Sequence, residues 1–214
     1  GKSISFALML VVVGFLAMQP DFGQSALVVF AWGVIYFIGG APMTLIVVVG
    51  AIVAGAGLVF YESSEHFARR IDGFLSPDVD PRTQLGYAAN AIQEGGFFGV
   101  GVGEGQVKWS LPDAHTDFII AVAAEEYGLI LVLAILGLYG VIVVRSLGRL
   151  VQERDPFARL AGAGMACIFG VQAMINMGVA VRLLPAKGMT LPFVSYGGSS
   201  VIAAGITMGM LLAL

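Results

Sequence analysis

Six long runs of apolar residues constrain the fold more than any other feature of this sequence. They cover residues 4–19, 25–40, 43–60, 118–144, 160–181 and 196–214. A helix of about 20 apolar residues spans the roughly 30 Å hydrocarbon core of a bilayer. Only 12% of the residues are charged and the mean hydropathy is +0.91, whereas a soluble domain has about 25% charged residues. We therefore predict an all-α, polytopic transmembrane helix bundle that forms one membrane-embedded domain over residues 1–214.

The positions of the basic residues predict how this bundle is oriented. The short loop 145–159 contains four arginines, namely Arg145, Arg149, Arg154 and Arg159. Lys and Arg accumulate in short cytoplasmic loops, so this loop is expected in the cytoplasm. Alternation then places the long polar loop 61–117 on the outer face, where "SEHFARRIDGFL" and "QLGYAANAIQ" are expected to form surface helices. Because the chain begins with Gly and is apolar to its last residue, we expect a fragment of a longer protein.

Several classes of site are excluded or left open by composition. The net charge is −3 and no basic stripe is present, which argues against a nucleic-acid partner. The single Cys167 excludes an intrachain disulfide and a cysteine-based zinc cluster. The two histidines, His66 and His115, are too few and too distant for a metal site. A carboxylate-bound Mg²⁺ or Mn²⁺ stays open.

The glycine-rich stretch "GGFFGVGVGEGQVK", residues 95–108, invites a phosphate-binding interpretation. Its spacing misses G-x-G-x-x-G, and no Ser or Thr follows Lys108 as a P-loop requires. Two alternatives remain from the sequence. The glycine N–H groups could hold a pyrophosphate with Lys108 as the cation, or the stretch could be a plain flexible loop.

Polar residues gather where the fourth apolar run begins. Asp117 lies at the start of this run, where the helix dipole favours a negative charge, and capping of the helix is one explanation. Asp113, His115 and Lys108 are close in sequence, and other outer loops add Asp21, Arg182 and Lys187. A carboxylate near cations at a membrane boundary is suited to act as a general base on a hydroxyl, which is the alternative to capping.

Two adjacent glutamates lie inside the same apolar run. At 100° per residue, Glu125 lies about 80° around the helix from Asp117 and about 12 Å deeper, while Glu126 lies about 180° away. Glu125 is therefore the candidate for a polar cavity beneath Asp117, and Glu126 is expected to face a neighbouring helix and to need its own donor. Packing within the bundle is the alternative for both. In "SYGGSS", Ser195 and Ser199 are expected to cap the last helix or to bind a ligand.

Five motifs together identify a family resemblance. They are residues 18–23 "MQPDFG", 99–108 "GVGVGEGQVK", 111–118 "LPDAHTDF", 124–128 "AEEYG" and 185–200 "PAKGMTLPFVSYGGSS". In this order they resemble the SEDS family of bacterial shape, elongation, division and sporulation proteins, and the division branch more than the elongation branch. The resemblance implies a fold of ten transmembrane helices, of which this chain matches the later six.

The resemblance also implies an activity. Members of the family polymerise lipid II into the glycan strands of peptidoglycan, without an established cofactor. Asp117 matches the essential aspartate of the "HTD" block, which is proposed to deprotonate the 4-hydroxyl of the acceptor sugar. Asp21 matches the aspartate of the "QPDFG" block, with a structural or a catalytic role. The predicted substrate-binding residues are His115, Lys108, Asp21, Glu125, Lys187, Ser195 and Ser199. 

The resemblance further implies a place and partners, and it has exceptions. It predicts the bacterial inner membrane at the division septum, with a class B penicillin-binding transpeptidase and other division proteins as partners. The sequence departs from the family pattern at "GYAANAIQ", residues 86–93, where a "GYQ" with a second Gln is common, and at Ala124, where Gly is common. The alternatives to a glycosyltransferase are a lipid II flippase and a non-catalytic scaffold of the division complex.

Overall fold

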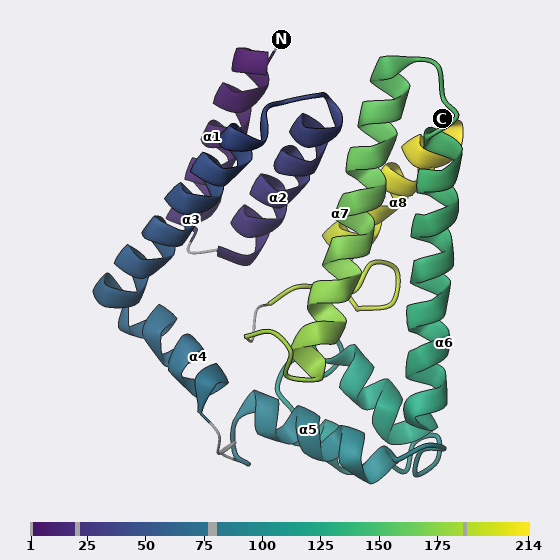
Figure 1. Cartoon of the computed structure of the whole chain (residues 1–214). Helices are drawn as coiled ribbons and strands as arrows, with labels where there is room; N and C mark the ends of the chain where they lie inside the picture. The colour runs from purple at the N-terminus through teal and green to yellow at the C-terminus, as the bar shows by residue number, and fades with distance from the viewer. Residues whose placement is uncertain (1, 20–21, 77–80, 186–187) are drawn as a thin grey trace.

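The predicted helical fold is confirmed by a computed structural model, which describes residues 2–19, 22–76, 81–185 and 188–214. Within these ranges the secondary structure is helical, without a β-strand (Figure 1). The elements are α1 (Lys2–Met18), α2 (Phe22–Ile38), α3 (Met43–Ser63), α4 (Glu65–Leu75), α5 (Gln84–Gly95), the 3₁₀ turn η1 (Val107–Trp109), α6 (Ile119–Leu150), α7 (Pro156–Ala180) and α8 (Gly198–Ala213). All six predicted apolar runs correspond to helices.

The helices alternate in direction as a membrane bundle requires. In Figure 1 the start of α1, the end of α8 and the turn between α6 and α7 lie toward the top, whereas α4 and α5 lie at the bottom. By length and composition, three described helices could cross a membrane, namely α3 over Ile46–Ser63, α6 and α7. The helices α1, α2 and α8 are shorter apolar helices. The chain is therefore a multi-helix membrane protein, with the arginine-rich turn and α5 at opposite ends.

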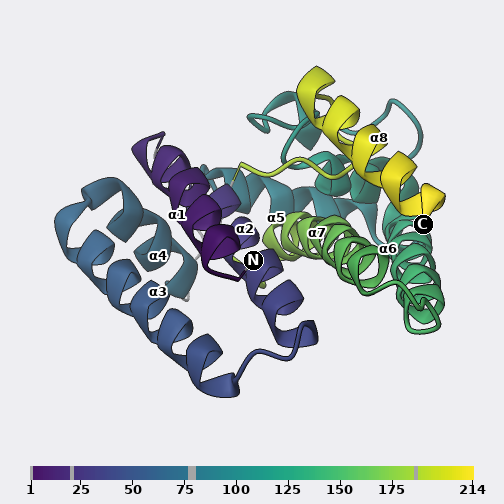
Figure 2. The same cartoon turned by 90° about the horizontal axis from the view of Figure 1, so that it is seen from above.

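Small residues allow α7 to form the centre of the bundle. A Cβ atom at Gly164 would lie 2.4 Å from the side chain of Ile35 in α2, and one at Gly170 would lie 2.8 Å from Val143 in α6. Glycine at these positions therefore lets the helices approach closely. Figure 2 shows the result, with α7 between α2 and α6.

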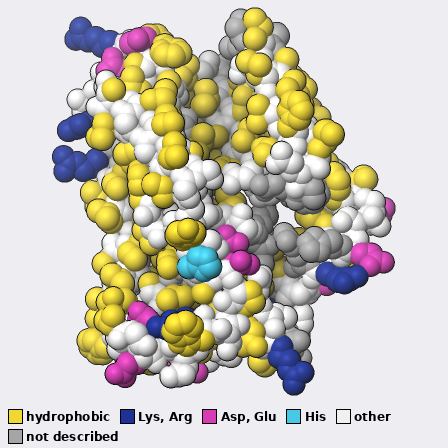
Figure 3. All heavy atoms as spheres, turned by 180° about the vertical axis from the view of Figure 1, so that it is seen from behind, with side chains coloured by type: hydrophobic (Ala, Val, Ile, Leu, Met, Phe, Trp, Pro, Cys, Tyr) yellow, Lys and Arg dark blue, Asp and Glu magenta, His cyan; other side chains and the backbone are white. Residues whose placement is uncertain are grey.

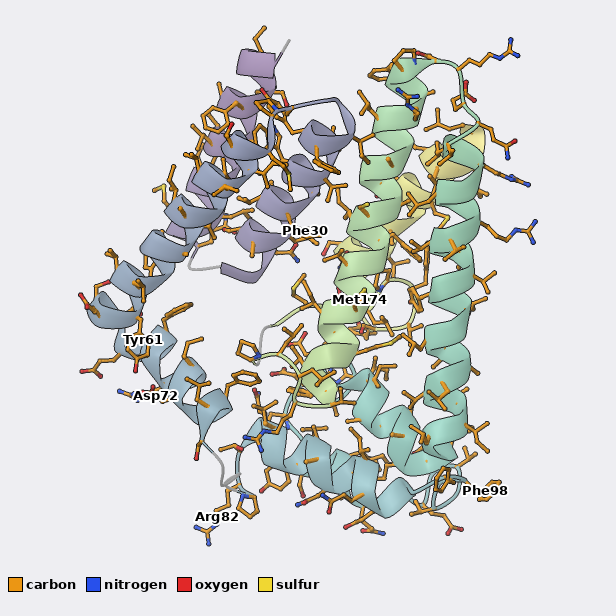
Figure 4. All side chains as sticks on the ribbon, in the orientation of Figure 1. Phe30, Tyr61, Asp72, Arg82, Phe98 and Met174 are labelled. Atoms are coloured by element: carbon orange, nitrogen blue, oxygen red, sulfur yellow. The ribbon has the colours of Figure 1, made fainter. Side chains whose placement is uncertain are left out.

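The predicted outer loop 61–117 contains two helices, α4 and α5, at the two expected stretches. Its start differs from the prediction, because α3 continues to Ser63. The Tyr61 hydroxyl donates to Asp72 Oδ1 at 2.7 Å and joins α3 to α4 at the corner seen in Figure 4. At the other end of α4, Arg182 Nη2 donates to the Ser76 carbonyl at 2.9 Å. A cation near a helix C-terminus is favourable, so Arg182 fastens α4 to the segment after α7.

The helix α6 breaks at Gly128, where φ is 78° and ψ is −178°. The predicted continuous span 118–144 is therefore wrong at this residue. In Figure 1 the piece before the break starts near the middle of the molecule and runs obliquely to the lower end, where the long piece begins. The helical wheel had predicted that Glu125 lies deeper in the bundle than Asp117. That prediction is wrong, because the short piece ends toward the lower end of the molecule and not in the bundle.

The backbone groups freed by this break are paired with the loop that follows α5. Four hydrogen bonds do this: Val100 N to Glu125 O (2.9 Å), Gly101 N to Glu126 O (3.2 Å), Leu129 N to Gly96 O (2.9 Å) and Ile130 N to Phe97 O (3.4 Å). A Cβ atom at Gly99 would lie 2.1 Å from Glu126 O, so the approach requires glycine. Residues 95–101 of the glycine-rich stretch are thus paired with α6 and do not form a plain flexible loop. They form a backbone clamp on the broken helix, and we call these residues the glycine clamp.

Candidate functional site

Three successive backbone carbonyls in the "HTD" motif are each held by a donor from a distant segment. The hydrogen bonds are Tyr196 N to His115 O (2.9 Å), Ser195 Oγ to Thr116 O (2.5 Å) and Asn176 Nδ2 to Asp117 O (2.9 Å). The donors come from α7 and from the segment between α7 and α8. The backbone that carries Asp117 is therefore fixed from two sides.

Asn176 connects these two sides. Its Nδ2 atom also donates to the Met189 carbonyl at 2.6 Å, and only 1% of the residue is exposed. One helical turn earlier, Gln172 Nε2 donates to the Thr190 carbonyl at 3.1 Å. Two amides of α7 thus hold the following segment, and Asn176 alone of the two also holds Asp117.

The turn before Asp117 is organised by Asp113. Its backbone has a φ of 56°, and its carbonyl accepts hydrogen bonds from Thr116 N at 3.1 Å and Asp117 N at 3.0 Å. Its Oδ2 atom accepts from Gln84 Nε2 at 3.3 Å. Arg182 and Phe193, in the facing segment, also have positive φ values of 59° and 64°. Such strained conformations cost about 1–3 kcal/mol each and gather at functional sites.

The Asp117 carboxylate is partly buried and approached closely by backbone. A Cβ atom at Gly188 would lie 3.2 Å from Asp117 Oδ2, and among the described residues no group donates a hydrogen bond to this carboxylate. Burial raises the pKa of Asp117 above its ordinary value, and the nearby Asp113 carboxylate raises this pKa further. The N-cap of α6 is Phe118, without a side-chain capping bond. Helix capping therefore does not explain Asp117.

Glu125 and Glu126 serve the loop after α5. Glu125 is fully buried, and its Oε1 and Oε2 atoms accept from Val107 N at 2.8 Å and Lys108 N at 3.1 Å. Glu126 forms an ion pair with Lys108 Nζ. Glu125 thus does not line a cavity beneath Asp117, and Lys108 is not the unpaired cation that the sequence suggested. Glu126 was predicted to need a donor, and in the structure this donor is Lys108.

Of the remaining predicted site residues, the structure describes His115, Ser195 and Ser199. His115 is exposed, and its ring meets the Tyr196 ring edge-on at 5.6 Å. Figure 3 shows a histidine beside acidic side chains on this face. Ser195 is buried and accepts from Leu191 N at 2.8 Å, so its hydroxyl holds the backbone rather than capping α8. Asp21 and Lys187 lie outside the described residues.

Ser199 lies at a cavity of about 380 Å³, which is lined by polar and apolar residues of α2, α7, α8 and the segment before α8. Gln24, Gln172 and Thr190 are among the other lining residues. A second cavity of about 490 Å³ lies between α2 and α3 and is almost entirely apolar. Neither cavity is lined by the 111–118 segment. The structure therefore brings His115, Asp117 and Ser195 together, whereas Ser199 lines the cavity of about 380 Å³.

Sequence reasoning missed Asn176 and Gln172. The available signal was an amide side chain inside an apolar run, because a polar group within a membrane helix needs a partner. For a metal ion, no group of three or more His, Cys, Asp and Glu side chains gathers within the described part of the chain. A divalent cation would depend on few protein ligands, as is usual for Mg²⁺ bound through substrate phosphates.

Comparison with known proteins gives consistent matches over the whole chain. The family model for FtsW, RodA and SpoVE, described as "Cell cycle protein", matches residues 2–214. A protein of Caulobacter vibrioides named "Probable peptidoglycan glycosyltransferase FtsW" is 46% identical over 215 residues, covering 100% of this chain and 55% of that protein. A protein of the same name from Trichlorobacter lovleyi is 36% identical over 95% of this chain and 55% of its own length. The chain spans about half the length of these curated relatives.

Two solved structures are similar in fold. A chain from the work described as "Structural coordination of polymerization and crosslinking by a peptidoglycan synthase complex" matches with a TM-score of 0.77 and 31% identity, over 99% of this chain and 61% of that one. The rod shape determining protein RodA of Thermus thermophilus matches with a TM-score of 0.63 and 29% identity, over 98% of this chain and 55% of that one. The backbone arrangement is thus more similar to the chain in the complex.

Proposed function

This chain belongs to the FtsW/RodA/SpoVE family of cell cycle proteins, and on this basis we propose that the protein is a peptidoglycan glycosyltransferase that polymerises lipid II. The family resemblance predicted from the sequence is confirmed. The names of relatives at 36–46% identity support the proposed activity, and they support the division branch. The substrate, the base and the septal location are parts of the proposal.

The reaction that we propose is an inverting glycosyl transfer at one face of the bundle. The Asp117 carboxylate removes the proton from the 4-hydroxyl of the acceptor GlcNAc as that oxygen attacks the anomeric carbon of the donor MurNAc. The new C–O bond forms while the bond to the pyrophosphate oxygen breaks. Undecaprenyl pyrophosphate leaves with the electron pair, the anomeric centre changes from α to β, and the proton stays on Asp117.

One observation carries the assignment of Asp117. Its carboxylate is partly exposed and has no hydrogen-bond donor among the described residues, while the backbone on which it stands is held by three distant donors. A general base needs such a fixed position and a pKa that is matched to proton transfer. Burial and Asp113 raise the pKa of Asp117, which makes its carboxylate a stronger base.

The leaving pyrophosphate needs positive charge, and the structure narrows the candidates. Lys108 is paired with Glu126, and Arg182 is bonded to the end of α4. We therefore keep Lys187 as the proposed substrate-binding cation, and we keep His115, Ser199 and Asp21 as proposed contacts. A Mg²⁺ or Mn²⁺ ion would supply positive charge at the leaving pyrophosphate, held there by Asp113 and the substrate phosphates.

We also propose a crosslinking partner. The similar chain with the higher TM-score comes from a peptidoglycan synthase complex described in terms of polymerization and crosslinking. A class B penicillin-binding transpeptidase would take the nascent glycan strand from this protein at the outer face of the bacterial inner membrane. Other division proteins at the septum are further proposed partners.

The test uses the intact protein, purified with its transpeptidase and supplied with lipid II. We expect Asp117→Asn, which keeps the size of the side chain, to bind its partner and to make no glycan strands. Glu65→Gln, the same change at an exposed carboxylate of α4 that pairs only with Arg69, is the control and should retain polymerisation. Normal strands from Asp117→Asn would rule out Asp117 as the base.

The same assay separates the alternatives. A flippase needs a membrane to cross, so strand formation in detergent would favour the glycosyltransferase. If the protein is a scaffold without catalytic activity, wild type and variants alike would make no strands and would leave lipid II unchanged.

A further inference from the structure

A basic crevice lies at the end of the bundle opposite α5. Its volume is about 220 Å³, and its lining includes Arg145, Ser146 and Arg149 of α6 and Met208, Leu211 and Leu212 of α8. We call this feature the basic crevice. In Figure 2 the C-terminal end of α8 approaches the end of α6 here, while the main packing of α8 is against α7.

The two arginines of the crevice lack acidic partners in the described part of the chain. The ion pairs recorded there join Arg69 with Glu65 and Lys108 with Glu126. The neighbouring turn does contain two carboxylates, but both are bonded to backbone amides. Their hydrogen bonds are Glu153 Oε1 with Arg154 N (2.8 Å) and Asp155 N (3.0 Å), and Asp155 Oδ1 with Phe157 N (2.9 Å), which caps α7.

The arrangement has the form of a headgroup site above an apolar surface. Residues four apart lie on one helix face, about 6 Å along the axis, so Arg145 and Arg149 line one side together. The piece of α6 after Gly128 runs to Leu150 and is about 33 Å long at 1.5 Å per residue, which matches a bilayer core of about 30 Å. Arg149 is about 30 Å along this piece and therefore lies at headgroup height. Arg145 is about 24 Å along it, and its long side chain can extend to the same height. Figure 3 shows basic side chains projecting from this edge of the molecule.

We propose that the basic crevice binds an anionic phospholipid of the cytoplasmic leaflet. Arg145 and Arg149 contact the phosphate, because guanidinium groups bind phosphate oxygens in a bidentate way. One acyl chain lies against Met208 and Leu212. Basic pockets between transmembrane helices on the cytoplasmic side are suited to such lipids. The bound lipid would connect the ends of α6 and α8, and this assignment does not depend on the proposed enzymatic activity.

The test measures lipid retention by the intact protein with native mass spectrometry. The protein is extracted from nanodiscs that contain phosphatidylcholine alone or phosphatidylcholine with cardiolipin. At about 1 kcal/mol for each basic residue, the double variant Arg145→Gln/Arg149→Gln should bind cardiolipin about thirtyfold more weakly than wild type. The control Arg154→Gln/Arg159→Gln removes the same charge from the neighbouring turn and the start of α7, outside the crevice, and should retain the lipid. Equal retention by the two double variants would overturn the proposal.

Two further variants distinguish loss of the lipid site from loss of the fold. Arg145→Lys/Arg149→Lys preserves the charge and should keep most of the retention, which separates loss of the site from loss of the fold. Met208→Trp fills the crevice and leaves both arginines, so it should also lose the lipid. Full retention by Met208→Trp, or displacement of cardiolipin by inorganic phosphate or by an acidic peptide, would show that the arginines bind a soluble anion or a protein instead.

Discussion

The side-chain amide of Asn176 donates a hydrogen bond to the backbone carbonyl of Asp117, with Nδ2 and O 2.9 Å apart. The same nitrogen donates to Met189 O at 2.6 Å. Asn176 thus joins α7, the segment before α8 and the backbone of the proposed base at one buried point. It acts on Asp117 only through the backbone, so we treat it as a positioning residue.

Asn176→Ala should lower the kcat of polymerisation by about a hundredfold with little change in KM, because an error of about 1 Å in the placement of a catalytic group has this cost. It should also lower the free energy of unfolding by about 1–3 kcal/mol, since buried carbonyls lose their donor. Gln172→Ala is the matched control, because Gln172 holds Thr190 and not Asp117. Similar losses of kcat in both variants would show that the segment, and not Asp117, needs the support.

The pH dependence of the activity should depend on Asp113. Activity is expected to fall as pH falls through the raised pKa of Asp117, because the protonated carboxyl is no longer a base. The Asp113 carboxylate contributes to this raised pKa. Asp113→Asn removes that charge and tolerates the positive φ of this turn. The acid limb of the pH–rate profile should therefore move to lower pH, and an unmoved limb would exclude electrostatic coupling between the two residues.

The raised pKa of Asp117 should also make the stability of the fold depend on pH. Activity rises as Asp117 loses its proton, whereas stability falls. The folded-state pKa of Asp117 is raised, so between the unfolded value of about 3.9 and the folded value the native state binds more protons than the unfolded state. Stability from this group is present at lower pH and is lost as pH rises. Asp117→Asn lacks this loss, so its melting temperature relative to wild type should be higher at neutral pH than in acid. A pH-independent difference would contradict the raised pKa.

Much of the fold could be predicted from apolar runs, because a membrane helix is specified by local composition alone. The break in α6 could not. Gly128 and Gly137 look alike in the sequence, and the difference is the glycine clamp, which comes from a distant part of the chain. Glu126 was correctly expected to need a donor. The donor, Lys108, depends on the path of the loop after α5, which periodicity cannot give.

The candidate site was predictable to a similar extent. The charge pattern and the family motifs pointed to Asp117. They also pointed to Lys108 and Ser195, whose polar groups the structure uses for internal bonds. Sequence proximity shows which charges are near one another, but the partner that each one finds depends on tertiary contacts.

Glu125→Gln should release the loop after α5. The carboxylate accepts two backbone N–H groups, from Val107 and Lys108, whereas an amide has one acceptor oxygen and would direct an N–H group at the other donor. We expect a loss of about 1–3 kcal/mol in the free energy of unfolding and faster hydrogen exchange at these two amides. Glu126→Gln, which only weakens the pairing with Lys108, is the comparison and should leave the same amides protected.

Gly128→Ala should detach the glycine clamp from α6. The added Cβ would lie 2.3 Å from Phe97 O. With φ 78° and ψ −178°, the backbone is in a region that is essentially restricted to glycine, and another residue there costs about 1–3 kcal/mol before any clash. The amides of Val100, Gly101 and Leu129 should lose protection from hydrogen exchange, because their hydrogen bonds cross this contact. Gly137→Ala is the control: its Cβ would meet no described atom within 4 Å, and alanine favours a helix by about 1 kcal/mol over glycine. It should therefore keep or raise the melting temperature, and equal protection of the three amides in both variants would show that the clamp does not depend on the break.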